Sequence, residues 1–584
     1  MYNQQISLEK NSLFEKSQQL GLNYVLKLNP DKLLSPCYSA LGKNPKEETY
    51  GGWEKQQIQG HSLGHYLSAL SGFVYQMQNS EAQKKLNYTV ECIKSIQRED
   101  GYFGGIPSTP FEKAFSGDFK VERFSLADWW VPWYSVHKIY AGLIDAYLFG
   151  KNETALEIVL KMANWATEGS KNMTDEQFQK MLYCEHGGMC KVFADLYEIT
   201  KEKKYLIMAE KFIDKEIIEP LIEKKDKLEG YHANTQIPKI IGIAKLYELT
   251  KKEEYKIASE FFFETVTQTR SYALGGNSNA EHFGKQFSES LGRSTCETCN
   301  TYNMLELAEH IFSWNQNSKI ADFYEIALYN HILASQEPIF GAKTYYVSTL
   351  PGHFKVYGTL ENSFWCCVGT GMENPERYNR FIARVLNDTI YLNLFIPSTI
   401  TTNDGWKLIL ETNFPYEQKA ILKVVEEGNH PKSLKIRIPA WKESRKEFSR
   451  NGYKLESSSI KKGDIFEIEL PEKIHFRKSL DNSEKFSIFY GPILLAADLG
   501  NQKMPNDIVE VHSVYLSSDE KNEIEISPII KDLSKIQEWI KSVNSEKLIF
   551  QNTEDSTSDQ TVYTLKPFYD IHHTRYTVYF NSKN

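Results

Sequence analysis

The apolar residues in the first half of the chain recur at helical spacing. From about residue 7 to 335, segments such as residues 138–148 and 303–312 place apolar side chains three and four positions apart, which is the spacing of one face of an α-helix. After about residue 382 the pattern changes to alternation and short β-branched runs, as in residues 406–412, and this is typical of strands. The sequence therefore predicts a helical half followed by a strand-rich half.

The helical half contains an internal repeat. Tyr147, Tyr197 and Tyr247 lie fifty residues apart, each near the end of one amphipathic segment and before a charged turn into the next. Less regular copies pass through Tyr75 and Phe312, so five helical hairpins are visible and the N-terminal helices can supply a sixth. Because self-similarity at a fixed period fixes architecture, we predict an (α/α)6 toroid, or barrel, closed by six hairpins.

The domain division follows from this change of pattern. A chain of 584 residues exceeds what one hydrophobic core usually carries. We assign residues 1–381 to the α/α-barrel catalytic domain and residues 382–584 to one or two β-sandwich domains, because many short strands separated by turn residues favour sandwiches over βαβ units.

Composition and charge narrow the classes of function. The net charge is −8, and no Lys/Arg cluster alternates with aromatic residues, so a nucleic-acid partner is disfavoured. No charged start leads into an apolar segment, and no run of about 18 apolar residues occurs, so we expect a soluble, cytoplasmic protein without a membrane partner. The aromatic content of 13% suits a sugar-binding cleft as well as a large core.

Four histidines recur about one helix length before successive repeat markers. In a toroid the first helices of the hairpins run parallel, so their N-terminal ends share one rim. A single histidine there would be an ordinary core residue, whereas four at the same point of successive repeats favour a substrate-binding mouth. These rim histidines are His65, His137, His186 and His232.

Four of the eight cysteines are concentrated in two short segments, which contain Cys296, Cys299, Cys366 and Cys367. Eight cysteines in a chain of this length are too sparse for a disulfide framework, so clustering points to metal binding or catalysis. We expect the other four to be buried small hydrophobic residues. They are Cys37, Cys92, Cys184 and Cys190.

Three sulfurs and one carboxylate have the character of a zinc site. Thiolates and a carboxylate oxygen are ligands that tetrahedral Zn²⁺ accepts, and we expect the cysteine pair in a turn marked by Gly369 and Gly371. A vicinal disulfide or a buried thiol pair stays open as an alternative. Zinc would keep a thiolate, the nucleophilic form of cysteine, at neutral pH. We call this the cysteine–glutamate cluster, and its members are Glu297, Cys299, Cys366 and Cys367.

A catalytic acid would have to come from another residue. Glu281 lies in a Gly/Asn/Ser-rich segment just before Glu297, and polar loops often carry function. A departing glycosidic oxygen needs a proton, and a glutamic acid can supply it. The alternative is a solvated surface glutamate.

Several motifs along almost the whole chain resemble one family. GHSLGHYLSAL, PWYSVHKIYAGL, EHGGM, GGNSNAEHF, STCETCNTYNML and SFWCCVGTGMEN occur in that order. With these motifs the chain resembles the β-L-arabinofuranosidases of glycoside hydrolase families 127 and 146, and the last motif is more similar to family 146.

The resemblance implies an activity and roles for particular residues. It implies a retaining hydrolase that releases L-arabinose from β-L-arabinofuranosides, on an α/α barrel followed by β-sandwich domains. The cysteine–glutamate cluster would bind zinc, with Cys366 as the nucleophile that forms a thioglycosyl intermediate and Glu281 as the general acid/base. The resemblance also suggests sugar contacts by His137, His186 and His232, with Tyr346 beside the nucleophile.

Two other classes of function remain as alternatives. A carbohydrate-binding scaffold stapled by zinc would need the same metal site but no acid. A toroid lyase or hydrolase acting on another plant cell-wall sugar should carry Arg and Lys to hold a uronate, and we count only Arg293 as close to the metal motifs. The expected partner is a small oligosaccharide, an arabinosylated glycan or a glycopeptide, and the oligomeric state stays open, a homodimer included.

Overall fold

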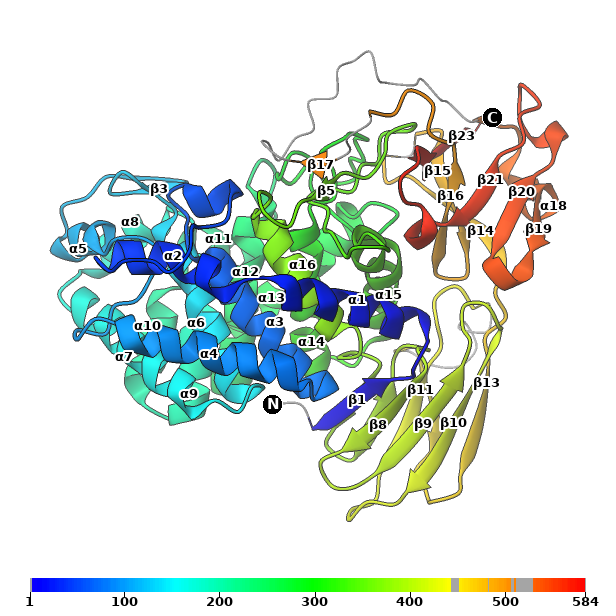
Figure 1. The fold of residues 1–584 in the computed structure, drawn as a ribbon. Helices are drawn as coiled ribbons and strands as arrows, with labels where there is room; N and C mark the ends of the chain where they lie inside the picture. The colour runs from blue at the N-terminus through cyan, green and yellow to red at the C-terminus, as the bar shows by residue number, and fades with distance from the viewer. Residues whose placement is uncertain (1–2, 443–450, 482, 506–508, 511–528, 583–584) are drawn as a thin grey trace.

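The computed structural model describes residues 3–442, 451–481, 483–505, 509–510 and 529–582. Helices occupy the first part of the chain and strands the second (Figure 1), as the change of pattern predicts. The last long helix ends at Arg377 and the following strands begin at Ala383. Among the described helices, none combines the length and apolar character that crossing a lipid bilayer requires.

Six helices form a closed inner ring, because each contacts the next and the last contacts the first. Two of them, α6 and α12, are buried around most of their circumference, which identifies them as core helices. The inner helices are α3 (His61–Met77), α6 (Pro132–Leu148), α9 (Met189–Thr200), α12 (Ala233–Thr250), α14 (Thr298–Trp314) and α16 (Cys366–Arg377).

Outer helices pack against this ring and bury one face each. The repeat markers Tyr147, Tyr197 and Tyr247 lie in the last turns of inner helices, and a short turn leads from each to an outer partner, as predicted. The outer helices are α1 (Leu13–Lys27), α4 (Ser80–Ile96), α7 (Glu153–Ser170), α10 (Lys203–Lys211), α13 (Glu253–Thr269) and α15 (Ser318–Ala327). Shorter helices are α2 (Pro30–Ala40), α5 (Thr109–Ser116), α8 (Asp175–Leu182) and α11 (Lys215–Ile222).

The sixth pair of the barrel is assembled from distant parts of the sequence. The N-terminal helix α1 contacts α16, so the N-terminal region supplies one member of this pair, as expected. Its inner member, however, is α16, which begins more than 300 residues later at Cys366. The hydrophobic pattern alone did not indicate this helix, because α16 holds two glycines and a proline.

Helices α3 and α6 approach each other closely at two glycines. A Cβ atom on Gly64 would lie 2.1 Å from the backbone carbonyl of Lys138, and one on Gly142 would lie 2.4 Å from the carbonyl oxygen of Gly64. Any larger residue at either position would therefore force the two helices apart.

The strands of residues 383–469 form two sheets with alternating buried and exposed positions. The five-stranded sheet has the order β1-β8-β9-β10-β13 and the four-stranded sheet the order β12-β11-β7-β6. Their strands are β1 (Gln4–Leu8), β6 (Ala383–Leu386), β7 (Thr389–Leu392), β8 (Ser398–Thr402), β9 (Lys407–Thr412), β10 (Lys419–Glu426), β11 (Ser433–Arg437), β12 (Tyr453–Ser457) and β13 (Ile465–Glu469). Because β1 pairs with β8, the N-terminus of the chain belongs to this β-sheet region.

A further sheet follows, with its described strands in the order β18-β23-β15-β16-β21-β20-β19, while β14 pairs with β15 and β22 with β16. Its strands are β14 (Ile474–Lys478), β15 (Lys485–Tyr490), β16 (Ile493–Asp498), β18 (Ile529–Ile530), β19 (Ile540–Asn544), β20 (Ile549–Asn552), β21 (Thr564–Pro567), β22 (Tyr576–Thr577) and β23 (Phe580–Ser582). Asn330 ties this sheet to the barrel, since its side chain bonds the carbonyl of Pro492 and the N–H of Leu494, both at 2.8 Å.

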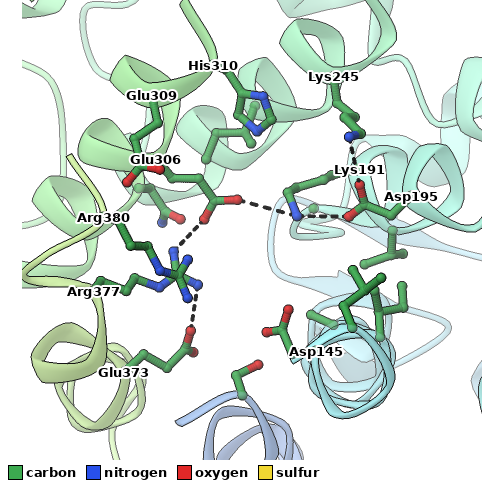
Figure 2. Close-up of a pocket in the computed structure, with 18 of the residues that line it drawn as sticks. Asp145, Lys191, Asp195, Lys245, Glu306, Glu309, His310, Glu373, Arg377 and Arg380 are labelled. Atoms are coloured by element: carbon green, nitrogen blue, oxygen red, sulfur yellow. Dashed lines mark hydrogen bonds and ion pairs between the residues drawn. The ribbon is translucent and has the colours of Figure 1, made fainter. Parts of the chain in front are cut away.

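A cavity of about 390 Å³ with charged walls lies inside the ring, and it reaches from His65 and His137 near the starts of α3 and α6 to the last turns of α6, α12 and α14. Figure 2 shows that its charges are paired: Lys191 of α9 lies 2.9 Å from Asp195 of the same helix and 3.4 Å from Glu306 of α14. Arg377 of α16 lies 2.9 Å from both Glu306 and Glu373. These ion pairs connect α9, α14 and α16 inside the barrel.

Candidate active site

The opposite end of the barrel, where the inner helices begin, carries the predicted rim histidines. His65 lies in the second turn of α3 and His137 in the second turn of α6, while His186 precedes α9. His232 is the N-cap of α12, and its Nδ1 accepts the N–H of Thr235 at 3.2 Å. The four histidines therefore lie near the N-terminal ends of four successive inner helices.

The cysteine–glutamate cluster is assembled at the same rim from two inner helices. Glu297 is the N-cap of α14, with Cys299 in its first turn, and Cys366 and Cys367 open α16. The four ligand atoms lie within 4.8 Å of one another, and all four residues are buried. The Cys367 sulfur lies 3.7 Å from Glu297 Oε1, and the Cys366 sulfur lies 3.9 Å from the same oxygen.

The two adjacent cysteines are free thiols. Their sulfurs are 3.9 Å apart, far beyond the length of a disulfide bond, so the structure does not contain the vicinal disulfide considered above. The expected turn at Gly369 and Gly371 is wrong, because both glycines lie within α16. Gly369 is needed for packing, since a Cβ there would lie 2.2 Å from Cδ2 of His65.

The electrostatics of the cluster favour a bound cation. Burial raises the pKa of the Cys366 and Cys367 thiols and of the Glu297 carboxyl. Burial opposes ionisation of Cys299 too, but hydrogen bonds from Cys366 and Cys367 lower its pKa to about 6. Glu297 Oε2 is buried and has no hydrogen-bond partner among the described residues. A soft divalent ion would stabilise the ionised forms of these ligands, so the donor set fits zinc.

Glu281 lies beside the cluster and is linked to it by a tyrosine. The Tyr345 hydroxyl donates to Glu281 Oε1 at 2.6 Å, and the Cys366 thiol donates to the same hydroxyl at 3.4 Å. His232 Nε2 lies 3.6 Å from Glu281 Oε2. Although burial opposes ionisation, His232 and Tyr345 hold the pKa of Glu281 below its usual value. The Cys366 sulfur and Glu281 Oε1 are therefore no further apart than the sum of their two distances to the Tyr345 hydroxyl oxygen.

The backbone of Glu281 is held in an unusual conformation. Its φ is +68°, and Ser278 and Ala280 also have positive φ, a region that non-glycine residues rarely adopt. The Glu281 carbonyl accepts the N–H of Ala233 at 2.7 Å, which ties this loop to the first residue of α12. Such backbone conformations are concentrated at functional sites.

The tyrosine whose hydroxyl reaches the Cys366 thiol is Tyr345, one residue before the predicted Tyr346. Tyr346 pairs through its backbone with Glu297, and its ring centroid lies 4.6 Å from that of Tyr345. The two rings therefore lie against each other, and it is the hydroxyl of Tyr345 that contacts both Cys366 and Glu281. The two adjacent tyrosines in the sequence were a signal, but not one that could decide between them.

Three of the rim histidines are neutral and each has a free ring nitrogen. Burial lowers the pKa of His65 and of His186 to about 4, and it also lowers that of His137. His65 Nε2, His137 Nδ1 and His186 Nε2 are buried without a hydrogen-bond partner among the described residues. Neutral imidazoles with an unused nitrogen suit the hydroxyl groups of an uncharged ligand.

Glu373 is a functional neighbour that the sequence interpretation missed. Its Oε1 lies 2.5 Å from His65 Nδ1, and its other oxygen accepts from the hydroxyl of Tyr302. Glu373 follows Cys366 by seven residues, two helical turns later on the same face of α16. This spacing would have identified Glu373 from the sequence if residues 366–377 had been predicted as a helix.

A closed α/α barrel with buried carboxylates and neutral histidines at one rim is compatible with a carbohydrate-processing enzyme, and the comparison with known families decides the class. The sequence profile described as "Beta-L-arabinofuranosidase, GH127 catalytic domain" matches residues 6–380, and that of the GH127 middle domain matches residues 389–469. A domain of unknown function matches residues 475–582. The chain therefore belongs to the β-L-arabinofuranosidase family GH127, and it is a glycosidase. Of the two families named above, the matching profile is that of family 127.

Individual relatives agree with this assignment. The chain is 23% identical, over 451 residues, to the non-reducing end β-L-arabinofuranosidase of Bifidobacterium longum subsp. longum, covering 68% of this chain and 67% of that protein. Ara127N-Se, a GH127 β-L-arabinofuranosidase from Geobacillus stearothermophilus T6, has a similar structure, with a TM-score of 0.75, 16% identity and coverage of 99% and 100% of the two chains. The GH127 β-arabinofuranosidase BT3674 has a TM-score of 0.74 at 16% identity, with coverage of 100% and 98%.

Proposed function

We propose that this glycosidase removes terminal β-linked L-arabinofuranose with retention of configuration, using Cys366 as nucleophile and Glu281 as general acid/base. The observation that carries the proposal is the hydrogen-bonded chain from the Cys366 thiol through Tyr345 to Glu281. Retaining glycosidases space their two catalytic groups by about 5–5.5 Å. The two hydrogen-bond distances, from Cys366 to Tyr345 and from Tyr345 to Glu281, are compatible with that spacing.

In the first step the sulfur of Cys366 attacks the anomeric carbon of the arabinose. Glu281 donates its proton to the glycosidic oxygen, the bond between that oxygen and the anomeric carbon breaks, and a thioglycoside of Cys366 forms. In the second step the Glu281 carboxylate takes a proton from water, the water oxygen attacks the anomeric carbon, and the Cys366 sulfur leaves. Two successive inversions restore the original configuration.

We propose Zn²⁺ as the cofactor, held by the cysteine–glutamate cluster. When bound, the ion supplies positive charge that keeps the thiolates ionised at neutral pH. Residues of the protein hold the nucleophile in place. Cys366 begins the buried helix α16, and Thr370 of this helix lies 3.2 Å from the sulfur of Cys299 in α14, so the two helices are held together beside Cys366.

The sugar would bind between the cluster and the rim histidines. His65, His137 and His186 offer their unpartnered nitrogens to its hydroxyl groups, with the proton of His65 held on the nitrogen facing Glu373. His232, whose Nδ1 accepts from Thr235, directs Nε2 toward Glu281, and Tyr346 completes the predicted set. The expected substrates are small arabinosylated oligosaccharides, glycans or glycopeptides of plant cell walls.

The configuration of the first-formed product tests this proposal. The protein is incubated with p-nitrophenyl β-L-arabinofuranoside, and NMR spectra record the anomeric proton before mutarotation. We expect turnover with β-L-arabinose appearing first. An α-anomer as the first product would mean direct attack by water, and a lack of turnover on β-L-arabinofuranosides together with turnover on another glycoside would assign a different sugar.

A further inference from the structure

The charged cavity inside the barrel reaches His65 at the rim of the candidate active site. His65 Nδ1 lies 2.5 Å from Glu373 Oε1, while Nε2 is buried and has no hydrogen-bond partner among the described residues. An ionised carboxylate only accepts hydrogen bonds, so an ionised Glu373 keeps the proton of a neutral His65 on Nδ1. The other nitrogen, Nε2, is then a hydrogen-bond acceptor.

The charge of the Glu373–His65 pair determines what Nε2 offers to a ligand. If the pair takes up one proton, it becomes either a neutral carboxylic acid that donates to Nδ1 or a carboxylate beside an imidazolium. Nε2 carries a proton in both cases, so proton uptake changes Nε2 from an acceptor into a donor. A sugar hydroxyl that donates to Nε2 would lose its acceptor.

Arg377 is the cation that favours an ionised Glu373. Its guanidinium lies 2.9 Å from Glu373 Oε2, and its Cζ lies 4.3 Å from the ring centroid of Tyr302, whose hydroxyl donates to the same oxygen. Burial alone favours the neutral acid, and a nearby positive charge opposes this effect. Arg377 thus acts on the pair from the interior of the barrel.

Glu306 shares Arg377 with Glu373 but has a second cation of its own. Figure 2 shows Arg377 between the two carboxylates, 2.9 Å from Glu306, which also lies 3.4 Å from Lys191 of α9. Among the ion pairs of the described residues, Glu373 pairs only with Arg377 and with the neutral His65. Loss of Arg377 would therefore leave Glu373, but not Glu306, without a positively charged partner.

Other charged and titratable groups surround the Glu373–His65 pair on the neighbouring helices. They are His61 of α3, Lys138 and Asp145 of α6, Lys191 of α9, Tyr302 and Glu306 of α14, and Glu376 of α16. Lys138 also opposes protonation of His65, whereas Asp145 and Glu376 are acidic groups that interact with Glu373. All of them are present both in the wild type and in an Arg377 variant, so the comparison isolates the charge of Arg377.

We propose that Arg377 is a positioning residue for substrate binding, which acts through Glu373 to hold His65 Nε2 as the hydrogen-bond acceptor for a sugar hydroxyl. The proposal rests on the proposed function, because it takes His65 to contact the sugar. Arg377 follows Cys366 by eleven residues on α16, or about 16 Å along a helix axis. It therefore acts on the sugar through His65 and not by contact.

The protonation state of His65 tests the effect of Arg377 without any catalysis. Two-dimensional NMR of protein labelled with ¹⁵N-histidine distinguishes protonated from bare ring nitrogens, and the His65 signals are those that His65→Asn lacks. In Arg377→Met, we expect Nε2 to gain its proton at a pH about 1–3 units higher than in the wild type. Arg377→Lys keeps the positive charge and should keep the wild-type midpoint. An unchanged midpoint in Arg377→Met would overturn the proposal.

Arg380→Met is the matched control. Arg380 pairs with Glu376 at 2.6 Å, so this variant also removes a buried arginine of the same region but leaves the pair of Arg377 and Glu373 intact. We expect no change in the midpoint of Nε2. A shift as large as that of Arg377→Met would show that loosening this region is sufficient, and would overturn the proposal. If Arg377→Met does not fold, Arg377→Gln removes the charge with a polar side chain.

The pH dependence of kcat/KM tests the contact between Nε2 and the sugar, because it reports groups of the free enzyme. With p-nitrophenyl β-L-arabinofuranoside, we expect the acid limb to move up by the same 1–3 units in Arg377→Met, chiefly through KM, and to stay in Arg377→Lys and Arg380→Met. A shifted Nε2 midpoint with an unchanged acid limb would overturn the proposal, since the sugar would not use this nitrogen. If the wild type does not cleave the glycoside, the proposed function fails separately, and the NMR comparison still tests Arg377.

Discussion

The surroundings of Glu281 bear directly on its proposed role as general acid/base. Its carboxyl receives a hydrogen bond from Tyr345 and lies beside His232, and both neighbours favour the ionised form. An ionised Glu281 suits the second step, in which it accepts a proton from water. The first step needs the protonated form. We therefore expect activity to depend strongly on protonation of Glu281 before the glycosidic bond breaks.

Glu281→Gln tests the assignment of the acid/base. The amide keeps the shape and a hydrogen-bond acceptor but cannot donate the proton, so hydrolysis of an alkyl β-L-arabinofuranoside should fall by about 10²–10⁴-fold. The loss on the p-nitrophenyl glycoside should be smaller in the first step, because that leaving group needs less protonation. Glu157→Gln, on an exposed glutamate of α7 paired with Lys94, is the control. Equal loss on both glycosides would move the acid to another residue.

Some site residues could be predicted from the sequence and others could not. Glu297, Cys299, Cys366 and Cys367 were predicted together from residue type, and the structure places their ligand atoms within 4.8 Å. Tyr345 was missed because the rings of the two adjacent tyrosines lie against each other, and residue type does not show which hydroxyl reaches Cys366.

At the scale of elements, α16 connects the two ends of the barrel. Its first turn carries Cys366 and Cys367, and two turns later Glu373 holds His65, while Arg377 binds Glu306 of α14. Repeat analysis predicted five helical hairpins correctly, because three of them repeat every fifty residues and two less regular copies flank these three. The inner helix of the sixth pair was not predicted, because its glycines and Pro375 weaken the helical signal in the sequence.

Glu373→Gln should make the protein less stable at neutral pH. Burial opposes its ionisation, but His65, Arg377 and Tyr302 hold its pKa at about 2, below the unfolded value of about 4.3. Its contribution to stability is therefore fully present above about pH 4.3 and is lost as the pH falls toward 2. We expect the variant to lose about 1–3 kcal/mol of unfolding free energy at pH 7, measured by urea titration.

The pH profile distinguishes this explanation from a simple packing defect. The difference between the wild type and Glu373→Gln should shrink between about pH 4 and pH 2, because the wild-type carboxylate is protonated there. A difference that is constant with pH would show that the charge of Glu373 contributes nothing, and Glu157→Gln again serves as the control.

At the scale of the whole molecule, the barrel and the β-sheet regions are joined by contacts between segments far apart in the sequence. Strand β1 pairs with β8, and Arg437 of β11 lies 2.8 Å from Asp322 of α15. The order of helices and strands was predicted from the hydrophobic pattern, but the pairing of β1 was not, since a short strand at the N-terminus carries no signal of its distant partner. The division at residues 381/382 stays a prediction.

Zinc bound at the cysteine–glutamate cluster, as proposed, should contribute to the stability of the whole molecule. It joins α14 to α16 and so closes the barrel, and ligand binding energy is coupled to folding. We expect about one zinc per chain by elemental analysis, and both Cys299→Ser and Glu297→Ala should lower the metal content and the Tm. Cys92→Ser, at a buried cysteine outside the cluster, should change neither the metal content nor activity. A metal-free protein with full activity would contradict the zinc assignment.

The most direct test of the account is the position of a covalent adduct. An L-arabinofuranose analogue with an electrophilic anomeric carbon is incubated with the protein, and fragmentation mass spectrometry locates the label within the peptide that contains Trp365, Cys366 and Cys367. We expect a single sugar on the sulfur of Cys366 and no label in Cys366→Ser. Label on Glu297 instead would mean that a carboxylate attacks the anomeric carbon and would contradict the account.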